Sequence, residues 1–427
     1  MKGRRLIVLI SIVFACQLYI RAQDTLSGYT VEQKSLDLYI AKKWKELTAF
    51  GNEALHKGYD YYYMQMRVGI AYYERKNYCL AESHFRKALQ FSSNDSLALE
   101  YIYYCYIFTG RNEDARKLSK KFNRELATKT GTNTKSPIDF VIIEGGTKIS
   151  DSSTYFKPAV YFQAGLSHTI KNKVSFFHAA TYFHQQNIVG TLTQLQYYLR
   201  ATIPVKKNWL ISPSFHLVNI NFSSETPTTT IDTLWPPGVP PHTQPPPGAP
   251  PFKTITNTSY STRSTNSIYF VGSFAIQKII KRFTLTAGST ISNISNTTEF
   301  INNGALYYSV LGNSKLVLGC AGYLHSIDNY KTTYASVAPF VYVQPTKSIS
   351  IKLSYLYNRG NNIIESNGYF INNSPDLTKS RIALLANFNI NKSIALYATY
   401  QLENKLENIQ QFNYHYNVIV VGIKIVP

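Results

Sequence analysis

The stretch KSRIALLANFNINKSIALYATYQL (Lys379–Leu402) alternates apolar and polar side chains on either side of a three-residue turn at 391–393. One face carries Ile382, Leu384, Ala386, Phe388 and Ile390 before the turn and Ile394, Leu396, Ala398, Tyr400 and Leu402 after it. Alternation over about ten residues is longer than the usual strand of a soluble protein. It matches a tilted membrane-spanning strand, which needs about 9–11 residues. The stretch therefore predicts one hairpin of a transmembrane β-barrel.

The composition of the 427-residue chain fits a barrel that faces lipid. Charged residues make up 16% and aromatic residues 14%, including 34 tyrosines, whereas a water-soluble domain carries about 25% charged residues. The mean hydropathy is only -0.17, as expected when the outside of a barrel is apolar and its inside polar. No internal run approaches the roughly 18 apolar residues that a membrane-spanning helix needs.

The N-terminus has the pattern of a secretion signal. Basic residues within 2–5 precede an apolar run at 6–15, and Ala22 lies at a suitable cleavage position. This pattern predicts a signal peptide over 1–22. Cys16 offers an alternative, because the residues before it partly resemble a lipoprotein cleavage site that would leave a lipidated Cys16.

The sequence gives little support for catalysis or for a bound cofactor. The four cysteines show no CxxC spacing, so neither a metal site nor a disulfide framework is expected. The histidines are scattered along the chain without metal-ligand spacing and without a serine and acid partner. We therefore predict no catalytic, cofactor-binding or metal-ligating residue, and no enzyme.

The chain is strongly basic. Its formal net charge is +20, from 44 Lys+Arg and 24 Asp+Glu. A secreted chain rarely meets nucleic acid, so we predict no nucleic-acid partner. Anionic lipid head groups and anions inside the barrel are the expected partners of this charge.

Residues 24–130 are expected to be helical, because Gly and Pro are scarce there and apolar residues recur at helical spacing. A self-similarity of 34 residues links a unit that begins near Tyr62 to one that begins near Ser96. The predicted packing residues are Gly69, Tyr72, Ala81, Phe85, Ala88, Tyr106 and Ala115. This spacing resembles tetratricopeptide (TPR) repeats, although Tyr103 stands where the second unit should have a small residue. The resemblance implies a stacked helical scaffold.

Beyond a polar linker at 131–137, the apolar period changes to two, and 138–427 is expected to form the barrel. We predict about fourteen antiparallel strands, within a range of about 12–16. The predicted spans are 138–149, 159–170, 174–185, 191–203, 209–222, 266–279, 283–293, 304–311, 315–326, 332–344, 349–357, 380–390, 394–402 and 414–426. The fold class predicted for the chain is multidomain, with an α-helical TPR-like repeat domain followed by an antiparallel transmembrane β-barrel.

The connections between the predicted strands alternate in length. Every second one is a turn of two to four residues, and the others are mostly longer and rich in Ser, Asn, Thr and Pro. The last strand, 414–426, resembles the closing strand of Gram-negative outer-membrane barrels, although the usual final aromatic residue is missing. Short turns of such barrels face the periplasm and long loops face outside. This implies a cell outer-membrane location with the helical domain in the periplasm. The longest predicted extracellular loop, 223–265, contains the proline-rich segment 235–252.

Charged residues inside the predicted strands should face the lumen, since a Lys or Arg that faces lipid at the bilayer midplane costs roughly 2–4 kcal/mol. The candidate lumen charges are Arg200, Lys352, Arg381, Glu144 and Lys148. Of these, Glu144 and Lys148 share a face of the first strand and are expected to pair. Two interpretations stay open. The lumen prefers anions, or its cations pair with loop carboxylates such as Glu365 or Asp376.

Three functions are consistent with this architecture. The first is an outer-membrane anchor and scaffold that contacts outer-membrane lipid and whose periplasmic TPR-like domain binds a periplasmic protein partner. The alternative is an outer-membrane pore or exporter with an anion-preferring lumen. Its cargo would be a polysaccharide if the resemblance in domain order to exporters of cellulose and poly-N-acetylglucosamine extends to function. A remote alternative is a barrel-embedded hydrolase.

Overall fold

A computed structural model of the protein describes residues 27–133, 136–170, 173–187, 190–205, 208–234, 253–294, 297–327, 330–360, 363–372, 376–407 and 411–427. The chain divides into two compact units: a helical unit that ends at Asn133 and includes Leu311–Asn313, and a barrel unit made of Thr134–Val310 and Ser314–Pro427. The predicted signal peptide 1–22, with Cys16, and the proline-rich segment 235–252 lie outside the described residues. Among the described helices, none has the length and apolar character needed to cross a membrane.

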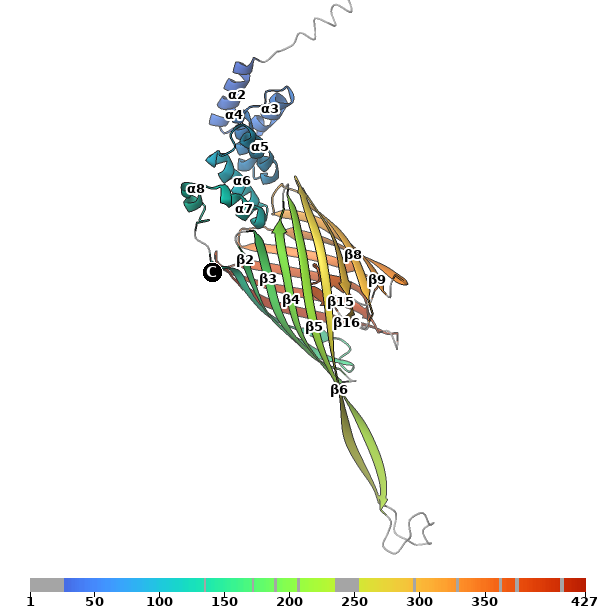
Figure 1. Cartoon of the computed structure of the whole chain (residues 1–427). Helices are drawn as coiled ribbons and strands as arrows, with labels where there is room; N and C mark the ends of the chain where they lie inside the picture. Colours follow the sequence, from blue (N-terminus) through green and yellow to red (C-terminus); the bar gives the residue numbers. More distant parts are fainter. Residues whose placement is uncertain are drawn as a thin grey trace, which may run out of the picture. The chain divides into compact units, whose positions relative to one another are not determined.

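The helical unit is a succession of short helices (Figure 1). Side chains cap several of them, as when Asp95 Oδ1 accepts a hydrogen bond from the Ala98 amide at 2.6 Å. The α-helices are α2 (Gly28–Ile40), α3 (Trp44–His56), α4 (Tyr62–Glu74), α5 (Tyr78–Phe91), α6 (Ser96–Phe108), α7 (Asn112–Leu118) and α8 (Arg124–Lys129). Helices α4 and α6 begin 34 residues apart, and so do α5 and α7. The helical period therefore matches the sequence, while its identification with TPR repeats stays a prediction.

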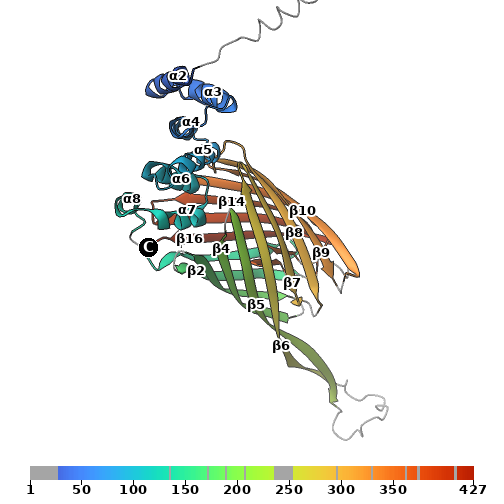
Figure 2. The same cartoon turned by 45° about the horizontal axis from the view of Figure 1, so that its top comes forward.

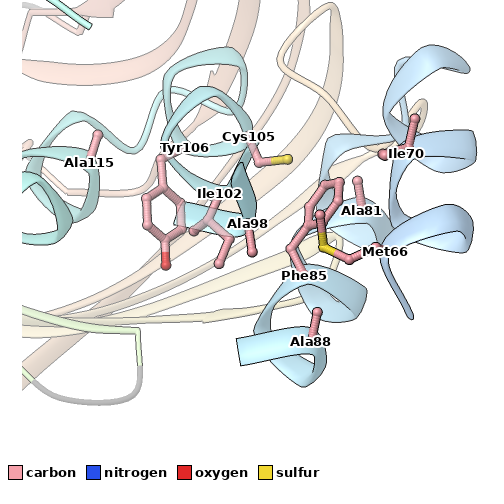
Figure 3. Packing of buried hydrophobic residues seen from close by; sticks show 10 residues of the cluster. All are labelled: Met66, Ile70, Ala81, Phe85, Ala88, Ala98, Ile102, Cys105, Tyr106 and Ala115. Carbon is pink, nitrogen blue, oxygen red and sulfur yellow. The ribbon is translucent and has the colours of Figure 1, made fainter. Parts of the chain in front are cut away.

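The core of the helical unit lies between α4, α5 and α6. Figure 3 shows the ring of Phe85 beside Met66 and Ala81. The predicted packing residues Ala81, Phe85, Ala88, Tyr106 and Ala115 are all buried. A Cβ atom on Gly69 would lie 2.7 Å from Cε1 of Phe85, so a side chain there would force the two helices apart. Tyr72 is half-buried and stacks on His84.

The equivalent position in the second unit carries a large side chain without disrupting the helix. Tyr103 is half-buried, and its ring meets Phe122 edge-on at 5.6 Å between centroids. The departure from the small-residue pattern is therefore accommodated by an aromatic contact within the helical unit.

The barrel unit is a closed, antiparallel, 14-stranded barrel, which confirms the predicted strand number. Its strands are β1 (Ile138–Ser150), β2 (Phe156–Ile170), β3 (Val174–Asn187), β4 (Gly190–Pro204), β5 (Trp209–Leu234), β6 (Lys253–Ile280), β7 (Phe283–Ser292), β8 (Glu299–Ser309), β9 (Leu316–Ile327), β10 (Thr332–Val343), β11 (Ile349–Tyr357), β14 (Leu377–Asn389), β15 (Ile394–Leu406) and β16 (Asn413–Ile425). The seam pairs β1 with β16, from Val141 opposite Ile425 to Ser150 opposite Tyr416. In Figure 2, β16 accordingly lies close to β2, the other neighbour of β1.

The outer surface of the barrel is apolar, as the alternation in the sequence predicts. On β14, Ile382, Leu384 and Phe388 are exposed, whereas Asn387 points inward and donates to Ser350 Oγ at 3.2 Å. Large apolar side chains are exposed in the same way around the wall, among them Leu195, Ile268, Phe274, Leu353, Leu396 and Val421. A continuous exposed apolar surface of this kind is rare in water-soluble proteins.

Two stretches predicted as loops form paired strands of their own, and β15 runs past its predicted span, 394–402, to Leu406. Strands β5 and β6 extend past their neighbours (Figure 1), and their ladder runs on from Ser223 opposite Ser264 to Leu234 opposite Lys253. The prediction of a loop over the whole of 223–265 is therefore wrong. The extended part of β5 is rich in Thr, which has high β-propensity. Beyond the lipid-facing region, β5 and β6 can pair with each other although their sequences no longer alternate between apolar and polar residues. The second such stretch, in the connection between β11 and β14, is described next.

Candidate functional site

The connection between β11 and β14 folds into a small hairpin of its own. Strand β12 (Ile363–Glu365) pairs with β13 (Phe370–Asn372) as a separate two-stranded sheet. Three successive residues at the tip have left-handed backbones, with φ of 53° at Ser366, 58° at Asn367 and 77° at Gly368. Asn and Gly tolerate this region, whereas Ser seldom adopts it. Strain at Ser366 thus has to be offset by the contacts that the tip makes.

Side chains on β4 and β5 hold the tip of the hairpin through its backbone carbonyl groups. Ser214 Oγ donates to Asn367 O at 2.5 Å, and the Tyr198 hydroxyl donates to the same oxygen at 3.2 Å. His216 Nδ1 donates to Gly368 O at 2.7 Å. Both Tyr198 and His216 are almost completely buried, so the hairpin tip lies inside the barrel.

The rest of the hairpin reaches further parts of the wall. Tyr369 receives a hydrogen bond from Gln163 of β2 and packs edge-on against Phe177 of β3. Glu365 forms an ion pair with Arg381 of β14, in which both side chains are about nine-tenths buried. Because these contacts come from strands on different sides of the barrel, the hairpin lies across the lumen.

An apolar contact anchors the hairpin on another part of the wall. Ile364 of β12 belongs to a buried cluster with Val271 of β6, Ile301 of β8 and Ile294 from the connection between β7 and β8. Burying a side chain of this size contributes about 1.5–3 kcal/mol. The hairpin is thus held by two apolar contacts, at Ile364 and at Tyr369, by one ion pair and by a few hydrogen bonds.

A cavity of about 450 Å³ lies beside the hairpin within the lumen, in the size range of small-molecule sites. Its wall includes five alanines, at positions 275, 305, 321, 338 and 383, on different strands. Small side chains at inward positions leave this space unfilled. The charged residues on its wall are Lys352, Arg381 and Glu365.

The five predicted lumen charges separate into different groups. Arg381 and Lys352 reach the cavity, and Arg381 bonds Glu365, which supports the interpretation that lumen cations pair with loop carboxylates. Arg200 lies away from the cavity wall, with its guanidinium 5.8 Å from the centroid of the Phe177 ring. Asp376, the other loop carboxylate considered, accepts a hydrogen bond from the Tyr414 hydroxyl at 2.5 Å.

The predicted pairing of Glu144 with Lys148 is wrong. Four residues along a strand span about 13 Å, which is too far for an ion pair. Lys148 instead bonds Glu403 of β15 at 2.9 Å. Glu144 accepts hydrogen bonds from the hydroxyls of Tyr161 and Tyr397.

Several residues of this site were not predicted from the sequence. Glu403 and Lys405 are almost completely buried, yet they fall in a stretch predicted as loop because the alternation ends at Leu402. Ser214, His216 and the hairpin tip also escaped prediction, since strand parity shows only that a side chain faces inward. Glu365 could be found from the sequence, because it is a carboxylate in a predicted loop and was named as a possible partner of the lumen cations.

The described residues contain no group of three or more His, Cys, Asp or Glu side chains placed to hold a metal ion. His325 and Glu299 do come together, with Nε2 3.5 Å from Oε2 and both side chains buried. They lie on adjacent strands, β9 and β8, and belong to no larger group of such side chains in the part of the chain that the structure describes.

No protein-family model matches the sequence, and no curated protein matches it. Among solved structures, the chain is similar to a Pseudomonas aeruginosa FadL homologue, with a TM-score of 0.39 and 9% identity over 67% of this chain and 89% of that chain. It is similar to the Pseudomonas putida toluene transporter TodX, with a TM-score of 0.41 and 8% identity over 69% and 90%. For the Acinetobacter baumannii outer membrane protein Omp33 the TM-score is 0.35, with 9% identity over 69% and 100%. Similarity at this level assigns neither a family nor a solute.

Proposed function

We propose that the protein is an outer-membrane channel whose lumen is gated by the β12–β13 hairpin. The observation that carries the proposal is the position of the hairpin, which lies across the lumen of a closed barrel and is held at its tip mainly by hydrogen bonds to two backbone carbonyl groups. Each such bond contributes only about 0.5–1.5 kcal/mol net. A segment held in this way can leave the lumen without unfolding the wall.

The location in the outer membrane rests on the physics of the barrel wall. A closed barrel has no unpaired strand edges, so its backbone groups remain satisfied in lipid, and its outward side chains are apolar. Strand β1 begins and β16 ends at the rim with the short turns. On the usual orientation of such barrels, this rim faces the periplasm. The helical unit, which precedes β1, is then periplasmic, and the gating hairpin enters from the extracellular side.

A reversible disulfide tests the gate directly. A Cβ atom on Gly368 would lie 3.7 Å from Cβ of Ser273, and bonded cysteines have Cβ atoms about 3.8 Å apart. Ser273→Cys with Gly368→Cys, in a Cys320→Ser background that removes the exposed cysteine of β9, should fix the hairpin in the lumen. The positive φ of Gly368 makes its substitution strained, and the single Gly368→Cys variant shows the effect of this strain alone. We expect single-channel openings in planar bilayers under reducing conditions and silence after oxidation.

The two single-cysteine variants are the controls, and both should conduct whether oxidised or reduced. Replacement of 363–372 by a short Gly-Ser linker should give a larger, steady current. An oxidised double variant that conducts like the reduced one, with the disulfide confirmed by mass spectrometry, would show that the hairpin is not the gate. Silence of the linker variant as well would overturn the channel itself.

The scaffold function remains a second candidate because of one feature of the helical unit. Large apolar side chains are exposed on it, including Tyr29, Tyr63, Phe91 and Leu97, and such groups suit contact with a periplasmic protein. A photo-crosslinking residue in place of Phe91, in the full chain in cells, should give an adduct of one defined mass. The same residue in place of the exposed Lys45 is the control, and adducts at neither position would remove this candidate.

A further inference from the structure

The lumen cavity holds an excess of positive charge. Two cations, Lys352 and Arg381, and one carboxylate, Glu365, contribute to its wall. Glu365 is already paired with Arg381. With two cations and one carboxylate among its described residues, the cavity wall therefore carries a net positive charge.

Lys352 has the features of a binding residue. It is half-buried, and its ammonium nitrogen lies 4.6 Å from the centroid of the Phe340 ring. No hydrogen bond or ion pair joins this nitrogen to any side chain or carbonyl in the described part of the chain. A partly desolvated ammonium group that lies against an aromatic face and has no hydrogen-bonded carboxylate can bind an incoming carboxylate.

Other polar groups at the cavity also lack partners. Arg381 Nη1 and Gln401 Oε1 are buried without a hydrogen bond within the described ranges, and both residues contribute to the cavity wall. Buried polar groups are normally satisfied, so this donor and this acceptor can each be satisfied by a water or by a polar molecule that enters the cavity. Such a molecule needs hydroxyl groups, which both donate and accept.

The remaining wall suits a compact, hydroxylated ring. Tyr307, Tyr323 and Tyr369 supply aromatic surface, and Thr286, Asn303 and Thr399 supply further hydrogen-bonding groups. We propose that the cavity binds a small hydroxylated monocarboxylate, such as a sugar acid, with its carboxylate on Lys352 and its hydroxyls near Arg381 and Gln401. This inference rests on the proposed channel function, because the cavity would hold the solute on its way through the lumen.

Three pyranoses of similar size but different charge test the proposal. D-glucuronate is anionic, D-glucose neutral and D-glucosamine cationic, and their affinities for the full-length protein in detergent micelles can be measured by isothermal titration calorimetry. A charge-assisted hydrogen bond of about 1.5–3 kcal/mol corresponds to a roughly 10- to 150-fold change in affinity. We expect glucuronate to bind at least about ten-fold more tightly than glucose, and glucosamine to bind more weakly than glucose.

Substitutions test whether Lys352 causes the stronger binding of glucuronate. Lys352→Gln should remove the advantage of glucuronate over glucose. The matched control is Lys424→Gln, because Lys424 is also half-buried, with its ammonium nitrogen 4.2 Å from the centroid of the Phe140 ring, but it lies outside the cavity wall. Glu365→Gln should act in the opposite direction and tighten glucuronate binding, since it removes the one carboxylate among the described residues of the wall.

The outcomes separate this inference from the channel proposal, because binding is measured without conduction. Equal binding of glucuronate and glucose, or an equal loss in the Lys352→Gln and Lys424→Gln variants, would overturn the assigned site. A protein that conducts through the hairpin gate yet shows this result is a channel without the proposed solute preference. Selective binding by a protein that never conducts would support the site and reject the channel.

Discussion

The helical unit and the barrel place their apolar side chains on opposite sides. In the helical unit, Phe85 and Ala88 are fully buried. In the barrel, Leu384 and Phe388 face outward, while Glu403 and Lys405 lie inside with exposed fractions of 2% and 0%. The difference teaches that hydrophobicity alone says little about burial in this chain. The apolar face of each helix packs against other helices, whereas the apolar face of each barrel strand lies on the outside.

Buried charge is handled alike in both units. Arg111, with a side-chain exposed fraction of 7%, bonds Glu82 at 2.6 Å and Asp114 at 2.7 Å in the helical unit. In the barrel, Arg381 bonds Glu365 and Lys148 bonds Glu403. An unpaired buried charge is strongly destabilising. Lys352 differs from these buried cations because it is half-buried, lies at the lumen cavity and has no ion pair among the described residues.

The largest expected change in stability comes from a cavity in the core of the helical unit. Phe85→Ala removes a fully buried ring and should lower the free energy of unfolding of that unit by about 3–5 kcal/mol. Urea unfolding followed by fluorescence, in a background where Trp44 is the only tryptophan, measures the change. The heat resistance of the barrel on electrophoresis should stay unchanged, and its loss would mean that the two units are not independent in stability.

Substitutions of two neighbouring leucines on β14 test whether the barrel has its apolar side chains outside and its polar side chains inside. Leu384→Arg puts a charge on the lipid-facing side of β14 and should destabilise the barrel by about 2–4 kcal/mol. Leu385→Arg puts the same charge on the inward side, where Leu385 borders the cavity, and should be tolerated much better. Refolding into lipid vesicles over a urea series gives both values. Equal effects would contradict the assignment of the two faces.

A titratable group in the core of the helical unit gives a pH-dependent effect. His84 packs against Tyr72, and burial lowers the pKa of His84 from 6.5 to about 4. The folded unit therefore keeps His84 neutral, and stability is lost as the pH falls from about 6.5 towards 4, by up to about 3 kcal/mol. The Trp44 fluorescence assay at several pH values measures this slope. It should be smaller in the His84→Gln variant, and an identical slope would contradict the prediction.

A smaller effect should follow from filling the close contact between α4 and α5. Gly69→Ala places a Cβ atom 2.7 Å from Cε1 of Phe85 and should cost about 1–2 kcal/mol through overpacking. Gly28→Ala is the control, because no atom lies within 4 Å of the Cβ it would add. If both substitutions had the same effect in urea unfolding, the close approach of the helices would not explain the glycine.

Much of the barrel was predictable from the sequence because its outer face has to be apolar at every second residue. The predicted span of β11 is identical to the observed one, and the inward assignment of Arg381 follows from parity alone. The alternation of apolar and polar residues is required only where the outer face of a strand contacts lipid. Beyond it, β5, β6 and β15 continue with polar residues on both faces, and nothing in the pattern marks their ends.

The candidate site was less predictable for a different reason. Strands β12 and β13 have three residues each, too few to show a period. The partner of Lys148 is 255 residues away in the chain, and partners at such separations depend on how the barrel closes. The sequence pattern identifies inward-facing charges, but it does not specify which of them meet.

The long-range contacts of the hairpin also constrain how the barrel is assembled. The hydrogen bonds to Asn367 and Gly368 join residues 152 to 169 positions apart, and the bond from Gln163 to Tyr369 joins residues 206 positions apart. Contacts of this range carry a large loop-closure cost and are slow to form. A wall that has reached only β11 still lacks both the hairpin and β16, the strand that closes the barrel against β1. The lumen is filled only after the last third of the chain, which contains the β12–β13 hairpin, has been added.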